Sequence, residues 1–215
     1  MSNFKTLKKI HRQKRVFFNE DFSIRIHRSL SWLERSEKEN NDSDAQFIFL
    51  WISFNAAYNI PFDEKEVFSE RGVFTKFFDI VLKLNNQKIY DFIWSRFSEE
   101  IRNILQNEYI MQAYWVSNDG EYINNWQEIK SKAIHKVNQA LVSKDTKVIL
   151  DILFQRLYVL RNQIIHGGAT WKGKLNRQQV NDGTKLLNGL VPVFIELMLE
   201  HPTENWGRIP FPITN

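Results

Sequence analysis

The sequence predicts an all-α protein folded as a single helical bundle of about seven helices. Apolar residues recur at intervals of three and four along most of the chain, and this spacing places them on one face of a helix. Gly and Pro account for only 8 and 5 of the 215 residues, which disfavours a turn-rich all-β protein. Residues typical of helix caps flank several of the apolar stretches.

Seven stretches carry the helical spacing. In chain order they cover residues 22–33, 47–58, 73–81, 89–104, 126–141, 149–164 and 180–199. The sixth stretch begins after Asp145, a residue type that favours helix N-termini, and ends before Gly167, where a left-handed cap residue is expected. Pro192 lies inside the seventh stretch and is expected to kink or split that helix.

Polar segments separate the helices, and those at 36–44, 61–68 and 117–124 are expected to be loops. None of them has the length of a linker between domains. The sequence therefore predicts one helical domain over residues 20–215, preceded by a basic arm over residues 1–19.

The net charge of +4 is unevenly distributed. Residues 1–19 hold six of the 29 Lys and Arg side chains and no acidic one, which leaves 23 basic against 25 acidic residues in the remaining chain. The sequence pI of about 9.2 therefore comes largely from this arm. The arm is expected to be a solvated tail, with an amphipathic helix around Leu7 and Ile10 as the alternative, and it could contact RNA or an acidic partner.

The composition excludes several classes of protein. The chain has no Cys, which excludes disulfide scaffolds, thiolate catalysis and Cys-ligated metals. Its five His show no metal-ligand spacing, and phosphate-binding glycine loops are missing, so we expect neither a metal nor another cofactor. The longest apolar run, 47–54, is too short to span a membrane, which predicts a soluble cytoplasmic protein without a membrane partner.

The stretch 47–58 is apolar on nearly all sides. Such a helix belongs in the centre of a bundle or at a subunit interface, and the first of these is the simpler interpretation. Asn55 and Tyr58 lie on it, where buried polar groups need partners, so they are candidates to orient the site described next or to make ordinary core hydrogen bonds. Five other aromatic residues are expected to anchor the core or an interface: Trp32, Trp94, Trp115, Trp126 and Trp206.

The residues best suited to chemistry lie at the end of the sixth stretch, in the segment Arg161-Asn162-Gln163-Ile164-Ile165-His166-Gly167-Gly168. Five helical positions rotate a side chain by about 500° and advance it by about 7.5 Å, so Arg161 and His166 suit a shared phosphate better than a direct contact. The guanidinium of Arg161 matches phosphate oxygens, and an imidazole can move protons near physiological pH. The alternative is an Arg paired with a carboxylate and a His that caps its helix.

This segment resembles the motif of the HEPN family of helical ribonucleases, in which an Arg, commonly followed by a polar residue, precedes a His by four to six intervening positions. Arg161, Asn162 and His166 match that motif, and the chain looks most similar to the HEPN group associated with phage defence and toxin–antitoxin loci. The resemblance implies a four-helix core with added helices. It also implies a homodimer in which two copies of the motif share one active site.

The resemblance further implies a metal-independent endoribonuclease that cleaves RNA through attack by the ribose 2′-OH. In this interpretation Arg161 and His166 are catalytic and Asn162 assists, in a toxin or abortive-infection effector restrained by a separate antitoxin or regulatory protein. The alternatives are a catalytically inactive HEPN-like module that binds RNA or protein, and a purely structural helical protein.

A basic segment follows the motif and is a candidate for RNA binding. It contains one aromatic and three cationic residues: Trp171, Lys172, Lys174 and Arg177. Aromatic rings can stack on the bases of single-stranded RNA while cations follow its backbone. A solvated basic turn is the alternative interpretation.

Overall fold

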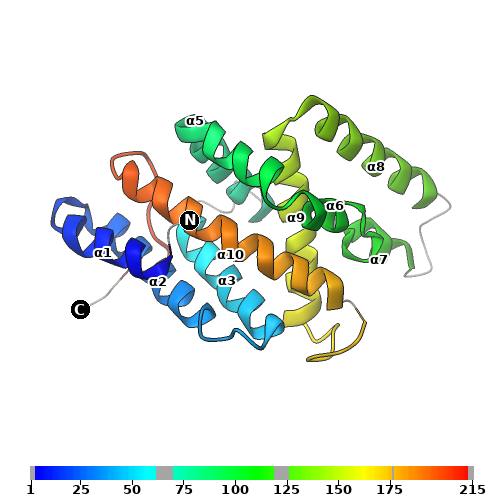
Figure 1. Cartoon of the computed structure of the whole chain (residues 1–215), viewed down its shortest axis with the longest axis horizontal. Coiled ribbons are helices and arrows are strands. Elements are labelled where there is room, and N and C mark those ends of the chain that lie inside the picture. The colour runs from blue at the N-terminus through cyan, green and yellow to red at the C-terminus, as the bar shows by residue number, and fades with distance from the viewer. Residues whose placement is uncertain (1–2, 62–69, 119–125, 176, 213–215) are drawn as a thin grey trace. The chain divides into compact units, whose positions relative to one another are not determined.

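The computed structural model describes residues 3–61, 70–118, 126–175 and 177–212. In these ranges all regular secondary structure is helical, with nine α-helices and two short 3₁₀ helices, which confirms the predicted all-α class (Figure 1). Most of the predicted loops 61–68 and 117–124 lies outside the described residues. None of the described helices combines the length and the apolar character needed to cross a membrane.

The chain forms two compact units. Unit 1 comprises residues 1–87 and 187–215, and unit 2 comprises residues 88–186. The division falls inside two helices, α5 (Glu70–Ser95) and α10 (Arg177–Glu200), rather than at a linker. Each unit is described separately below.

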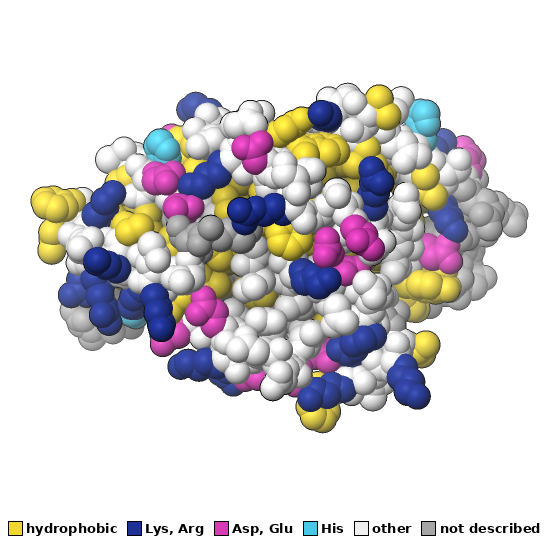
Figure 2. Space-filling model, viewed as in Figure 1, with side chains coloured by type: hydrophobic (Ala, Val, Ile, Leu, Met, Phe, Trp, Pro, Cys, Tyr) yellow, Lys and Arg dark blue, Asp and Glu magenta, His cyan; other side chains and the backbone are white. Residues whose placement is uncertain are grey.

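Unit 1 begins with the basic segment, which is a packed helix rather than the solvated tail expected from its charge. Helix α1 (Phe4–Lys14) packs on α2 (Glu20–Ser36), and the 3₁₀ helix η1 (Arg15–Phe17) connects them. Leu7 is fully buried, while the Lys and Arg side chains gather on the surface of α1 (Figure 2). The helical alternative for this segment is therefore the observed one.

Helix α3 (Ser43–Tyr58) is the centre of unit 1. None of its residues is exposed, and Phe47, Leu50 and Phe54 are completely buried. Three rings from two other helices surround Phe54: Phe77 and Phe78 from α5 and Phe194 from α10 have centroids 5.9–6.2 Å from it. Because α3 has no polar side, most of its surface has to be covered by other helices.

Two serines join α2 to α3. The Ser29 hydroxyl donates to the Ser53 carbonyl at 2.8 Å, and the Ser53 hydroxyl donates to the Ser29 carbonyl at 2.7 Å. Both residues are fully buried. Small side chains let the two helices approach closely, and the reciprocal bonds satisfy both hydroxyls without water.

Two arginines of α2 hold the C-terminal segment of unit 1. The buried Arg25 guanidinium donates to the carbonyls of Ala57 and Asn59 at the end of α3, at 3.0 and 2.8 Å. It also donates to the carbonyls of Gly207 and Arg208 at 3.1 and 2.8 Å. Arg28 donates in the same way to two further carbonyls, those of Pro210 and Phe211.

Unit 2 contains the end of α5, the first turns of α10 and the helices between them. Its complete members are α6 (Ser98–Gln106), η2 (Glu108–Ile110), α7 (Gln112–Asn118), α8 (Trp126–Ser143) and α9 (Thr146–Ile165). Helix α9 contacts α6, α8 and η2, so it is the central helix of this unit. Its residues Leu150, Leu153, Leu157 and Leu160 are fully buried.

Three helix boundaries differ from the sequence prediction. The third stretch and the start of the fourth, predicted as separate helices, both belong to α5, which is kinked between them by non-helical dihedral angles at Asn85 (φ −157°, ψ 81°). The fourth stretch, predicted as one helix over 89–104, is divided because α5 ends at Ser95 and α6 begins at Ser98. Conversely, α10 is not split at Pro192, which lies inside a continuous helix.

Two histidines lie where α1 meets α2. His11 is only 3% exposed, its ring stacks on that of His27 at 6.4 Å, and Lys8 Nζ lies 3.4 Å from His27 Nδ1. Burial lowers the pKa of both rings, and the Lys8 ammonium lowers each pKa further. Both effects favour the neutral form of the rings in the folded protein.

These lowered pKa values predict that acid weakens unit 1. The free energy of unfolding that depends on neutral His11 and His27 is fully present above the unfolded-chain pKa of about 6.5 and is lost as pH falls through the lower folded-state values. Thermal unfolding followed from neutral to mildly acidic pH should show this loss in the wild type. The double variant His11→Asn/His27→Asn should show a flatter profile, and equal slopes for the two proteins would contradict the prediction.

Replacing Arg25 with Met should destabilise unit 1 by about 3 kcal/mol or more, because four carbonyls lose a charged donor in a buried place. Chemical denaturation would measure the difference. Arg28→Met is the matched control, because its bond to Phe211 is exposed and its loss should cost less. A smaller effect for Arg25→Met than for Arg28→Met would refute the role assigned to Arg25.

Candidate functional site

Helix α9 ends where the sequence predicts, and both of its predicted caps are present. The Asp145 carboxylate accepts from the Val148 amide at 3.0 Å at the N-terminus. At the C-terminus Gly167 has φ +73°, the left-handed conformation that closes a helix, and its amide donates to the Ile164 carbonyl at 3.3 Å. These caps fix the place where the predicted catalytic segment leaves the helix.

Arg161 and Asn162 are in direct contact. Arg161 Nη1 donates to Asn162 Oδ1 at 2.7 Å, and the guanidinium carbon lies 5.3 Å from the centre of the Tyr158 ring. Both Arg161 and Asn162 are half-buried. The amide and the ring therefore hold the guanidinium against the surface of α9, with part of it open to solvent.

His166 is the residue at which α9 ends. Its amide donates to the Asn162 carbonyl at 3.0 Å, so its backbone still belongs to the last turn of the helix. Its side chain is exposed, and within the described residues no hydrogen bond to its ring is found. The imidazole is thus open to a substrate from solvent.

The basic segment after α9 forms an irregular loop. Lys172 has a positive φ of 53°, and its ammonium lies 4.7 Å from the centre of the Trp171 ring. Arg177 Nε donates to the Gly173 carbonyl at 3.1 Å, which braces the loop against the start of α10. Figure 2 shows that cationic and apolar side chains both lie on the surface of this loop.

A groove of about 750 Å³ lies between this loop, the start of α10 and the segment around η2. Its lining includes Asn107, Tyr109, Trp115, Gly168, Lys174 and Gln179. Neither Arg161 nor His166 is among its described lining residues, although Gly168 is only two positions beyond His166. Of the predicted RNA-binding residues, Lys174 is the one that lines it.

The Tyr109 carbonyl organises the wall of this groove. It accepts from Trp115 Nε1 at 2.7 Å and from Gln163 Nε2 at 2.7 Å. The first bond fixes the indole ring, and the second joins the wall to α9 three residues before His166. Trp115 and Tyr109 are each 45% exposed, so Trp115 does not anchor the core, and the alternative that it anchors an interface stays a prediction.

Two buried polar groups of unit 2 were not predicted from the sequence. Gln179 is only 6% exposed, and its Nε2 has no hydrogen-bond partner among the described residues. Arg156 on α9 is 8% exposed, and burial lowers its pKa to about 10, which leaves it cationic at neutral pH. A polar residue gives no sequence signal of burial when it interrupts an apolar helix face.

Asn55 and Tyr58 belong to unit 1, whereas the residues above belong to unit 2. Tyr58 is 4% exposed and packs against Phe54, with ring centroids 4.5 Å apart. Asn55 Oδ1 is buried without a hydrogen-bond partner among the described residues. Their assignment to orient Arg161 or His166 stays a prediction.

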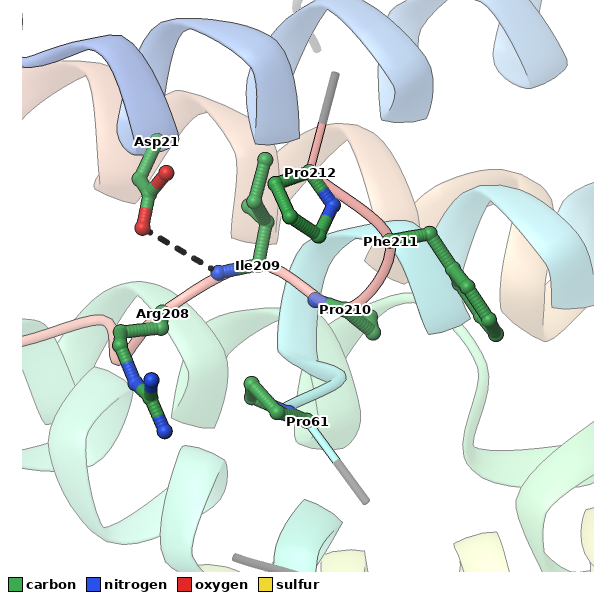
Figure 3. A pocket seen from close by; sticks show the side chains of 7 residues that line it. All are labelled: Asp21, Pro61, Arg208, Ile209, Pro210, Phe211 and Pro212. Carbon is green, nitrogen blue, oxygen red and sulfur yellow. Dashed lines mark hydrogen bonds between the residues drawn. The ribbon is translucent and has the colours of Figure 1, made fainter. Parts of the chain in front are cut away.

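Unit 1 has a smaller hollow of about 260 Å³, formed by the C-terminal segment (Figure 3). Pro61, Pro210 and Pro212 line it together with Asp21, which accepts from the Ile209 amide at 3.4 Å. The Asp21 carboxylate already has a structural partner in the Ile209 amide, and most of the other lining residues are apolar. We therefore place the candidate site in unit 2.

Within the described ranges, no three His, Asp or Glu side chains converge in a way that could hold a metal ion. In comparisons with known proteins, no family model, curated protein or solved structure matches the chain. The functional argument therefore rests on the residues of unit 2.

The turn after His166 gives a test of how the candidate segment is held. Gly167→Ala should lower the free energy of unfolding by about 1 kcal/mol, because an L side chain is strained at a φ of +73° although space is open around it. Gly167→Asn should cost less, since Asn tolerates this conformation. Denaturation curves would measure both variants, and an Ala variant as stable as the wild type would contradict the assigned strain.

Proposed function

We propose that this protein is a metal-independent endoribonuclease of the HEPN type, with Arg161 and His166 as catalytic residues and Asn162 as an assisting residue. The observation that carries the proposal is the end of α9, where an exposed imidazole follows a guanidinium that Asn162 Oδ1 holds at 2.7 Å. The all-α architecture agrees with the fold that the family resemblance implies.

In the proposed reaction the ribose 2′-OH attacks the adjacent phosphorus, and the bond from phosphorus to the 5′-oxygen of the next nucleotide breaks. A base takes the 2′ proton and an acid gives a proton to the departing 5′-oxygen, so the products are a 2′,3′-cyclic phosphate and a 5′-hydroxyl. His166 transfers protons, and Arg161 stabilises the charge on the phosphate oxygens. DNA is not a substrate because it lacks the 2′-OH.

The reaction favours a homodimer. One imidazole cannot act as base and acid in the same step, whereas a twofold axis beside the motif would supply two His and two Arg. Ile165 supports this arrangement, because it is an apolar side chain, 50% exposed, next to His166. A second copy of the chain would cover it.

We further propose a cytoplasmic toxin or abortive-infection effector as the biological role. Cleavage of cellular RNA stops growth, so such an enzyme requires restraint by a separate antitoxin or regulatory protein. This part of the proposal rests on the family resemblance of Arg161, Asn162 and His166.

Purified protein incubated with RNA in excess chelator should cleave it and leave 2′,3′-cyclic phosphate ends. His166→Ala should lower the cleavage rate by a factor of about 100 or more, the usual contribution of a general acid–base group. The cleavage rate and the chemistry of the product ends are the measurements. Equal rates for wild type and His166→Ala, or product ends without the cyclic phosphate, would disprove the proposed mechanism.

His135→Ala is the matched control, because this His lies on α8 outside the segment and its loss should leave the cleavage rate unchanged. Induced expression of the same three proteins extends the test to the biological role. Growth arrest that requires His166 supports a toxic ribonuclease.

The second candidate is a catalytically inactive HEPN-like module that binds RNA or protein. The groove favours it, because exposed aromatic rings and a cation lie there without Arg161 or His166 among the described lining residues. In the assays above this candidate predicts salt-sensitive RNA binding without cleavage.

A further inference from the structure

We propose that the groove of unit 2 binds one unpaired nucleobase of single-stranded RNA, stacked on Tyr109 and Trp115 and hydrogen-bonded by the Gln179 amide. This inference gives the proposed ribonuclease its class of substrate and therefore rests on that function for the identity of the ligand. It adds three residues outside the Arg161–His166 segment to the RNA-binding surface.

The rings are arranged for stacking before any ligand binds. Trp115 Nε1 is held by the Tyr109 carbonyl at 2.7 Å, and the Tyr114 ring packs edge-on against both Tyr109 and Trp115 at 5.2 Å. Each of the two lining rings keeps 45% of its surface open. A rigid ring loses little conformational freedom when a base stacks on it, which favours binding.

Gln179 supplies a hydrogen bond that the folded chain leaves unmade. Its side chain is more than nine-tenths buried, it lines the groove, and its Nε2 has no partner among the described residues. An unsatisfied buried donor costs free energy. Nε2 is closed to solvent, so the amide has to rotate toward the groove for an acceptor on a ligand to recover that cost. The carbonyl oxygens and ring nitrogens at the edge of a nucleobase are such acceptors, and they are accessible when the base is unpaired.

The charges around the groove suit a nucleic acid backbone. Lys174 lines the groove and is exposed, so it can meet a phosphate.

These features favour single-stranded RNA over a duplex, because the base faces of a duplex are stacked and cannot reach the rings. A volume of about 750 Å³ lies in the range of pockets that hold small ligands, so one nucleotide can enter.

The test measures binding separately from cleavage. Full-length His166→Ala protein, which binds without turnover, is titrated against fluorescein-labelled oligouridine, and anisotropy gives the Kd. Adding Trp115→Ala should weaken binding about tenfold to a hundredfold, the range for one base–aromatic stack, while Trp115→Phe should restore most of the affinity. Gln179→Met should weaken binding less, because it removes one hydrogen bond and keeps the stack.

Trp32→Ala is the control, because this Trp is 37% exposed but lies in unit 1 outside the groove. Far-ultraviolet circular dichroism checks that each variant is folded. If Trp115→Ala does not fold, Tyr109→Ala replaces it, since that change removes the ring and keeps the carbonyl that holds Trp115 and Gln163. Binding of an RNA duplex of equal length should not respond to any of these changes.

Three results would overturn the inference: no binding of oligouridine by His166→Ala, a Trp115→Ala variant that binds like Trp32→Ala, or equal losses on the duplex and the single strand. Other results would refute the proposed ribonuclease without refuting the base-binding groove. A wild type that does not cleave RNA, but whose groove variants lose single-strand binding, refutes the ribonuclease and keeps the base-binding groove. Cleavage that depends on His166 but not on the groove residues supports the ribonuclease and refutes the base-binding groove.

Discussion

The enclosure of α3 is the constraint on which unit 1 depends. A helix without a polar side has to be covered over most of its surface, and α2, α5 and α10 contribute to this cover. The aromatic rings of α5 and α10 and the serine pair with α2 meet this requirement in different ways. The aromatic rings fill the volume between α3 and the helices α5 and α10. The small serine side chains let α2 approach α3 closely.

Much of the fold was predictable because its signals are local. The Asp145 cap, the helix over α9 and the left-handed Gly167 each depend on a few neighbouring residues. A break between the third and fourth apolar stretches was predicted from their spacing, but its position at Asn85 was not, since neither Pro nor Gly marks it. The continuity of α10 through Pro192 was missed for a similar reason, because burial of Leu190, Val191 and Phe194 holds the helix together on both sides of that residue.

The candidate site also has one part that was predictable from the sequence and one part that was not. Arg161, Asn162 and His166 are near neighbours in sequence, so their common location at the end of α9 follows from the helix itself. The groove joins segments that are far apart in the chain. No sequence signal pointed to Tyr109, and Trp115 was expected to anchor the core or an interface. The Tyr109 carbonyl connects the two regions, since Gln163 reaches it from the same turns of α9 that carry the motif.

The way in which α2 holds the C-terminal segment has a consequence for how the chain tolerates change. Arg25 and Arg28 bind main-chain carbonyls, and every residue type has one. The two arginines thus bind the segment through the path of its backbone. Substitutions at its exposed positions should be tolerated as long as that path is kept, whereas Trp206 and Ile209 are buried and Gly207 has a φ of +73°.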